Sequence, residues 1–338
     1  MILSQMQPLK ALGNKLKIGG GAWVRKSLVV FQFFVSMGLS ISTFVVKNQL
    51  EFMQEVNLGY DKEQVVALNY HHNMREAIPT LRDEMVRSGA AISISRAADM
   101  PHHVKAGYKI FSGGDNTREF MITGYAADPD LIKTINLELM EGQNYSESDP
   151  ARRSLEDENA QMPILLNESA ITEMGWTAKE AIGKRVNIGF TNNALVKGVV
   201  KDFYFNSLHQ KVGPLVIFND PDEANILLIK LSAGNPTANL ATIGEVWKKL
   251  IPDRPFNPKF LDQEYASVYQ SEQNVSLIFS LFSGIAVFIA LMGLFGLVSY
   301  VALRRTREIS IRKVLGATQR DVLLVLSMDF LKLLGISA

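Results

Sequence analysis

The sequence predicts a membrane protein in which two complete transmembrane α-helices flank an α+β domain. Two runs without a formal charge predict the helices, residues 27–46 and residues 275–303. A bilayer core about 30 Å thick needs roughly 20 helical residues, so both runs are long enough to cross it. Between them, short apolar runs of strand length mix with helical patterns, which indicates an α+β domain. A further apolar stretch at residues 321–338 is expected to start a third span.

Basic residues outside the two runs predict how the chain crosses the membrane. Residues 1–26 hold five lysines and arginines and no acid, and the segment after residue 303 is also net positive. Lys and Arg close to a span stay in the cytoplasm, so both ends are expected inside and residues 47–274 outside. We interpret this charge as topology and lipid contact rather than nucleic-acid binding. A signal peptide is the alternative for the first run, but the run is too long and no A-x-A-like cleavage site follows.

The domain between the spans is expected to depend on its hydrophobic core, because the sequence has no cysteine and hence no disulfide or thiolate metal site. The first span is expected to continue as a helix toward Gly59, since apolar Leu50 and Met53 recur at helical spacing. The domain forms one body or carries a second lobe at about residues 135–205. The strands expected from apolar runs are 65–70, 91–95, 108–111, 120–126, 163–167, 185–189, 195–200, 214–218 and 225–232.

The helices expected in this domain are 74–88, 168–174 and 236–251. Pro79 either kinks the first helix or marks its true start. A hairpin is expected to join residues 185–189 to 195–200, with its turn at residues 191–193. The almost wholly polar stretch 146–161 is expected to be a surface loop.

No arrangement of residues indicates catalysis or a cofactor. The sequence lacks a G-x-x-x-x-G-K-[ST] phosphate loop and a G-x-S-x-G nucleophile motif, so we expect no enzyme. The pairs His71–His72 and His102–His103 raise the question of a metal site. Adjacent histidines point in different directions, however, and no nearby acid completes a recognisable ligand spacing. They are expected to be polar surface residues.

Small residues in the two spans allow close approach of the helices. Ordinary span composition explains the same residues equally well, because glycine is common in membrane helices. Gln32 is the only amide in the first span, so it is expected to face another helix rather than lipid. The small residues that would lie at a helix contact are Ser36, Ser40, Ala286, Ala290, Gly293 and Gly296.

The run REISIRKVLGAT (307–318) after the second span resembles the segment that MacB/FtsX-type ABC transporter permeases carry after a corresponding helix. Three further stretches match this family, and the resemblance covers nearly the whole chain from about Trp23. They are LVVFQFFVSMGLSISTFVVKNQLEFM (28–53), PILLNESAITEMGWTAKEAIGKRV followed by VKGVVKDFYFNSLHQKVGPLVIF (163–218), and PFNPKFLDQEYASVYQSEQ (255–273).

The resemblance implies an outer domain of the MacB periplasmic-core type and a separate cytoplasmic ABC ATPase as partner. In this family the outer domain moves with ATP binding and hydrolysis, which passes force across the membrane and exports or releases peptides, lipoproteins or similar cargo. The segment 304–320 would then dock on the ATPase; alternatively, it is a basic flank lying on the lipid interface. The residues implied in coupling are Arg307, Glu308, Ile309, Ile311, Arg312, Lys313, Val314, Leu315 and Gly316.

The chain departs from the family in its number of spans. Family members have four spans, or eight in two similar halves, whereas this chain completes two. It therefore resembles the second half of an eight-span permease, truncated, which would pair with another half or protomer in a bacterial cytoplasmic membrane. The alternative is a two-span sensor or scaffold without transport activity. Such a sensor needs a cytoplasmic output module, for which the residues after Leu303 are too few and too apolar.

Overall fold

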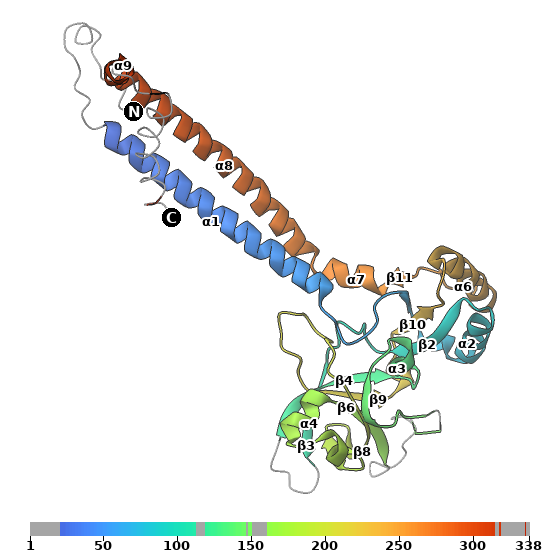
Figure 1. The fold of residues 1–338 in the computed structure, drawn as a ribbon. Coiled ribbons are helices and arrows are strands. Elements are labelled where there is room, and N and C mark those ends of the chain that lie inside the picture. Colours follow the sequence, from blue (N-terminus) through green and yellow to red (C-terminus); the bar gives the residue numbers. More distant parts are fainter. Residues whose placement is uncertain are drawn as a thin grey trace, which may run out of the picture. The chain divides into compact units, whose positions relative to one another are not determined.

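The computed structural model of the chain describes residues 21–112, 119–146, 148–150, 161–314, 318 and 335. The chain divides into two units (Figure 1). One contains the long helices and comprises residues 1–52 and 270–338, and the other runs from Met53 to Tyr269.

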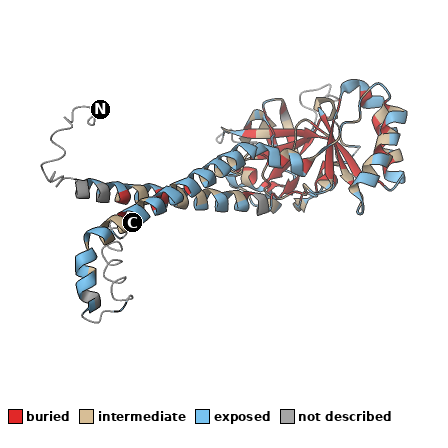
Figure 2. Cartoon of the chain, turned by 90° about the horizontal axis from the view of Figure 1, so that it is seen from above, coloured by how far each residue is buried: buried red, intermediate tan, exposed pale blue. Residues whose placement is uncertain are grey.

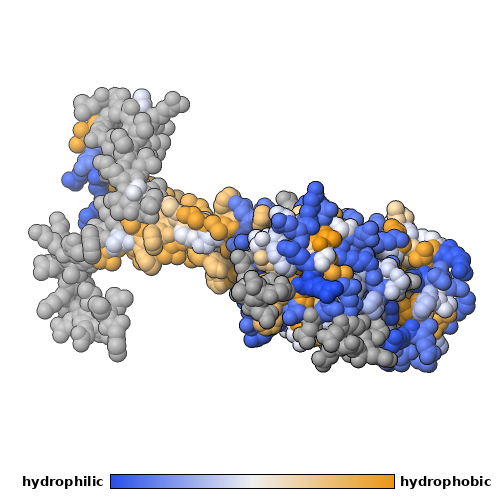
Figure 3. All heavy atoms as spheres, turned by 90° about the horizontal axis from the view of Figure 1, so that it is seen from below, coloured by the Kyte–Doolittle hydropathy of each residue, from blue (hydrophilic) through white to orange (hydrophobic). Residues whose placement is uncertain are grey.

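Two long helices, α1 (Gly21–Glu55) and α8 (Gln270–Arg304), dominate the first unit and are followed by the short helix α9 (Thr306–Val314). Within the described residues, Ser27–Met53 and Gln270–Arg304 are each long and apolar enough to cross a membrane. Most of their large apolar side chains are exposed, as the orange band along the helices shows (Figure 3). Both helices extend beyond the uncharged runs, and α1 does so because its apolar spacing continues past residue 46. The predicted basic linker and third span fall largely outside the described residues.

The second unit combines eleven strands with helices of varied length. Buried residues follow its strands, whereas exposed residues prevail along the long helices of the first unit (Figure 2). Its strands are β1 (Val65–Asn69), β2 (Ala91–Ala97), β3 (Ala106–Ser112), β4 (Glu119–Ala127), β5 (Leu139–Gly142), β6 (Met162–Asn167), β7 (Arg185–Ile188), β8 (Thr191–Val200), β9 (Leu215–Asn219), β10 (Ile226–Leu231) and β11 (Lys259–Phe260). Its helices are α2 (Ile78–Arg87), α3 (Leu131–Thr134), α4 (Glu168–Met174), α5 (Ala178–Ala181), α6 (Pro236–Leu250) and α7 (Leu261–Val268), with the 3₁₀ helices η2 (His72–Ala77) and η4 (Pro221–Glu223).

Six of the strands close into a barrel. They pair in the order β4-β3-β7-β8-β6-β9, and the parallel pairing of β9 with β4, from Thr123 opposite Leu215 to Ala127 opposite Asn219, completes the ring. Alternate residues of all six strands form one buried cluster, as expected for inward-facing positions of a small barrel. Residues of α4 and α5, such as Met174 and Ala181, join this cluster.

Strand β5 pairs with β8 of the barrel, and the other four strands form a sheet in the order β11-β1-β10-β2. Helices α2 and α6 cover one face, where Leu81, Met85 and Trp247 pack among the apolar residues of the strands. The opposite face joins the outer surface of the barrel in a second buried cluster. That cluster also receives α7 through Leu261 and Tyr265.

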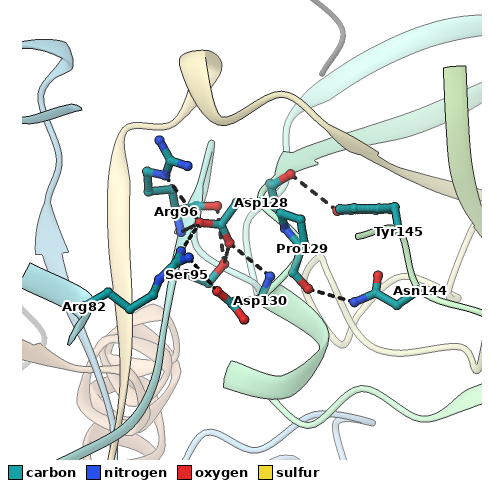
Figure 4. Close-up of polar contacts among 9 residues, drawn as sticks. Arg82, Ser95, Arg96, Asp128, Pro129, Asp130, Asn144 and Tyr145 are labelled. Atoms are coloured by element: carbon teal, nitrogen blue, oxygen red, sulfur yellow. Dashed lines mark hydrogen bonds and ion pairs between the residues drawn. The ribbon is translucent and has the colours of Figure 1, made fainter. Parts of the chain in front are cut away.

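The sheet and the barrel meet at β2 and β4, which share a single register pair, Ala97 opposite Ala127. Directly after it, the carboxylate of Asp128 is 1% exposed. It accepts hydrogen bonds from Ser95 Oγ at 2.8 Å, from the Arg96 backbone N–H at 3.0 Å, and from Arg82 of α2 at 2.9 Å (Figure 4). This one carboxylate therefore connects α2, β2 and the end of β4.

The expected strands and the three expected helices are confirmed, and the position of one turn is corrected. The hairpin turn lies at Gly189–Phe190, because Ile188 pairs with Thr191 and β8 already begins there. The β-branched Thr191 suits a strand better than a turn. The first helix begins at Ile78, with Pro79 in its first turn, where the missing N–H costs nothing. Of the strands in residues 135–205, β6, β7 and β8 belong to the barrel and β5 pairs with β8, so they form no sheet of their own.

Candidate functional site

Serine residues form a polar contact between α1 and α8. Ser36 is 6% exposed, and the hydroxyls of Ser40 and Ser283 lie 3.1 Å apart. Ser40 donates its hydroxyl hydrogen to the carbonyl oxygen of Ser36 at 2.8 Å. Because a serine has only one such hydrogen, Ser283 is the donor in the bond between the helices. Small hydroxyl side chains at this position allow both a close approach and a hydrogen bond between the helices.

Gln32 of α1 lies against Gly293 of α8, as the prediction that Gln32 faces another helix requires. A Cβ added at Gly293 would lie 2.5 Å from Gln32 Oε1 and 3.7 Å from a methyl carbon of Val29. The backbone of Gly293 therefore faces Gln32 Oε1 with no space for a side chain between them. Gln32 Oε1 is buried and has no conventional hydrogen-bond partner within the described part of the chain. Glycine is thus the residue that fits at position 293.

The other small residues predicted at the contact lie in different surroundings. Ala290 is 1% exposed, Ala286 is half-buried, and Gly296 is exposed with no atom within 4 Å of an added Cβ. Val29 and Leu297 form a further buried apolar contact. The structure thus brings Ser36, Ser40, Ala290 and Gly293 to the helix contact and leaves Gly296 outside it.

The helix α8 ends at Arg304, and α9 begins two residues later. The hydroxyl of Thr306 donates to the carbonyl oxygens of Ala302 and Leu303 at 3.2 and 2.8 Å. A hydroxyl that bonds back to the preceding turn competes with the backbone and bends a helix. These hydrogen bonds of Thr306 lie at the break between α8 and α9 (Figure 1).

The helix α9 presents apolar side chains beside charged ones. Ile311 is 60% exposed and Val314 is 88% exposed, whereas Ile309 is half-buried. Arg307 and Glu308 are exposed as well. Exposed aliphatic side chains flanked by charge are typical of a surface that meets another molecule. Of the remaining residues predicted in coupling, the side chains of Arg312 and Lys313 and the whole of Leu315 and Gly316 lie outside the described residues.

The histidine pairs behave differently from one another. His71, His72 and His103 are exposed, whereas His102 is half-buried and its ring meets that of Tyr265 edge-on, with centroids 6.0 Å apart. The expectation of a surface residue is therefore wrong for His102, because the apolar surface of Tyr265 covers its ring. Burial, and next the neighbouring His103, lower the pKa of His102 from 6.5 to about 4. In the part of the chain that is described, no three acidic or histidine side chains are grouped as metal ligands.

Sequence reasoning missed three residues of the contact between the long helices, namely Ser283, Val29 and Leu297. Ser283 lies seven residues before Ala290, which is two turns of helix and therefore the same face. That spacing was the available signal. Val29 and Leu297 resemble the other apolar residues of their helices, so no signal in the sequence separates them.

Residues 280–337 match the family model described as FtsX-like permease C-terminal. This segment includes most of α8 and all of α9, and the match agrees with the resemblance found in the sequence. No curated protein matches the chain in sequence.

Solved structures similar to the chain include the periplasmic region of MacB from Actinobacillus actinomycetemcomitans. It is 15% identical, with a TM-score of 0.41 over 64% of this chain and 97% of that one. Another is the extracellular domain of the noncanonic ABC-type transporter YknZ from Gram-positive bacteria. It is 11% identical, with a TM-score of 0.36 over 56% of this chain and 93% of that one. At TM-scores this low, neither likeness establishes a shared fold.

Proposed function

We propose that this chain, with its FtsX-like permease C-terminal region at residues 280–337, is the permease subunit of an ABC transporter or a part of that subunit. The family match carries the proposal, because it includes α9, whose apolar and charged side chains are exposed together. In this proposal a separate cytoplasmic ATPase hydrolyses ATP. The chain passes the resulting movement to the second unit (Met53–Tyr269), called the outer unit from here on because this proposal places it outside the membrane. That unit acts in the export or release of a peptide, lipoprotein or similar cargo.

The surfaces of α1 and α8 support a membrane location. Phe31, Phe44, Leu277 and Phe295 each expose more than half of their surface on these helices. Such a band of apolar side chains is unfavourable in water and favourable in lipid. We place the chain in a bacterial inner membrane, with residues 47–274 outside and both ends in the cytoplasm, in accord with the basic residues that flank the spans. Lipid and another permease half or protomer would then cover the exposed band.

The helix α9 is the proposed docking site for the ATPase. Its backbone is helical without burial of Ile311 and Val314, so these side chains are available to enter a groove of a partner. The positive charge of Arg304, Arg305 and Arg307 beside them favours an acidic rim on the partner. The rival explanation, a basic flank resting on lipid, requires the same exposure but no specific protein partner.

Co-purification with the cognate ATPase tests this proposal. The double variant Ile311→Asp/Val314→Asp is expected to retain about a tenth or less of the bound ATPase, because each unpaired carboxylate buried in a groove costs at least about 1–3 kcal/mol. Both side chains are exposed, so the variant should still fold.

The variant Val86→Asp on α2 serves as control, since it introduces the same charge at an exposed valine of the outer unit. Equal binding by the double variant and the control would exclude α9 as the docking site. If the unchanged chain binds no ATPase at all, the assignment as a permease subunit fails.

A further inference from the structure

One long loop of the outer unit contacts both of the chain segments that connect this unit to the long helices. Residues 201–214, here called the bridging loop, contain neither helix nor strand. An irregular segment of this length within a packed domain is uncommon and often functional. The bridging loop is also well packed, because Phe203 and Phe205 are buried in the cluster between sheet and barrel.

The first contact is with the segment that follows α1. The backbone N–H of Tyr204 donates to the carbonyl oxygen of Leu58 at 2.8 Å. Gly59 has a φ of +81°, and a Cβ added there would lie 2.8 Å from both the Asp202 carbonyl oxygen and Phe203 Cβ. The backbone after α1 therefore lies directly on the bridging loop, with no space for a side chain between them.

The second contact is with Tyr269, the residue immediately before α8. The backbone N–H of Leu208 donates to the hydroxyl oxygen of Tyr269 at 3.1 Å. The ring of the adjacent His209 meets the Tyr269 ring with centroids 6.3 Å apart. A side chain at the end of α7 thus holds the far part of the bridging loop.

The base of the bridging loop is fixed to the barrel. Asp202 accepts hydrogen bonds from Asn167 Nδ2 at 2.7 Å and from the Ser169 backbone N–H and hydroxyl at 2.9 and 2.5 Å. Asn167 is fully buried, and its Oδ1 accepts from the N–H of Leu215, the first residue after the loop. The carboxylate and the amide thereby anchor both ends of the loop to β6 and α4.

We infer that the bridging loop transmits movement of the segments next to α1 and α8 to the barrel. Tyr269 and Gly59 are its positioning residues, and this inference rests on the proposed function. A loop fixed at both ends to the barrel and in contact with both segments moves when either segment moves. A change at Tyr269 should therefore weaken the hydrogen bond of the Tyr204 backbone N–H, on the other side of the loop.

Amide hydrogen exchange of the full chain in detergent, read at single residues, tests this inference with the variant Tyr269→Phe. Loss of the hydroxyl removes the acceptor for Leu208, so exchange at Leu208 is expected to rise about fivefold, the equivalent of one ordinary hydrogen bond. Exchange at Tyr204 is expected to rise at least twofold if the loop acts as one body. The control is Tyr70→Phe, because the buried Tyr70 hydroxyl has no hydrogen-bond partner within the described residues to lose.

A rise at Leu208 with unchanged exchange at Tyr204 would show two independent attachments and overturn the inference. No rise at either amide would overturn it too, because Tyr269 would then not hold the loop. The measurement needs no ATPase, so its outcome is independent of the co-purification experiment. If exchange follows the expectation and no ATPase binds, transmission through the bridging loop is supported while the permease assignment fails.

Discussion

Gly59 shows how a single residue can decide the contact between two segments. It combines a positive φ with a distance of 2.8 Å between an added Cβ and the backbone of the bridging loop. Gly89 has a similar φ of +75° but open space around it. Alanine substitutions at these two glycines therefore distinguish the free-energy cost of the backbone conformation from the cost of a steric clash.

The variant Gly59→Ala is expected to lower the apparent Tm of the outer unit more than Gly89→Ala does. Both alanines carry the conformational penalty of about 1–3 kcal/mol, but only residue 59 must also push the bridging loop aside. Thermal unfolding of the full chain in detergent, followed by tryptophan fluorescence, measures both. Equal shifts would show that the loop yields easily and that the contact at Gly59 is loose.

His102 makes the outer unit sensitive to acid. Its pKa is about 4 in the folded chain and 6.5 in the unfolded chain, so the unfolded state binds the proton more readily. The stability that neutral His102 provides is complete above about pH 6.5 and is lost as the pH falls toward about 4. Glu264 opposes the shift and His103 reinforces it.

The variant His102→Gln is therefore expected to flatten the dependence of Tm on pH between about pH 6.5 and about pH 4, relative to the unchanged chain. Tm measured in steps across this range provides the check. The variant His72→Gln, at an exposed position, should leave the slope as it is. An unchanged slope in His102→Gln would assign the acid sensitivity to other groups.

Among the elements, the junction of β2 and β4 depends most on one side chain. Only one register pair joins these strands, whereas Asp128 collects donors from α2 and β2. A buried carboxylate with several donors is stable only while those donors remain. The polar contacts of Asp128 therefore add to the single strand pair and to the buried apolar cluster that joins the sheet to the barrel.

Replacing Asp128 with alanine is expected to destabilise the outer unit by about 3–5 kcal/mol, because two arginines lose a shared, buried partner. Chemical unfolding of the full chain in detergent measures the loss. The matched control is Glu138→Ala, which removes the exposed ion pair with Lys201 and should cost less than about 1 kcal/mol. A loss as small as that of the control would mean that the strand pair and the apolar cluster hold the junction without Asp128.

The elements could be predicted from the sequence wherever one pattern dominated. Continuous apolar runs predicted β6, β9 and β10, and the two long runs without charged residues predicted α1 and α8. The short elements α3, β5 and β11 have too few residues to show a period, so they could not be found. The contact of Gln32 was predictable because an amide among apolar residues needs a partner. Its location at Gly293 depends on the packing of two helices far apart in the sequence.

At the scale of the whole molecule, the sequence distinguishes the long apolar helices from the domain between them. It does not reveal how the strands of that domain are arranged. Charge and hydropathy separate the long helices from the outer unit. Closure of the barrel, in contrast, depends on β4 pairing with β9, and nothing in either strand identifies the other. The bridging loop was not predicted for the same reason, since its hydrogen bonds join residues 58, 204, 208 and 269.

The pairing of strands has a consequence for the order in which the outer unit acquires its structure during synthesis. The barrel cannot close before β9 has been made, and β1 and β2 do not pair with each other but with β10, which lies between them. The barrel therefore cannot close before residue 219 has been translated, and β1 and β2 cannot pair with β10 before residue 231 has been translated. Contacts this distant in sequence slow folding and expose unpaired strands in the meantime. Strands β1 and β2 therefore stay without their final partner through most of the synthesis of this unit.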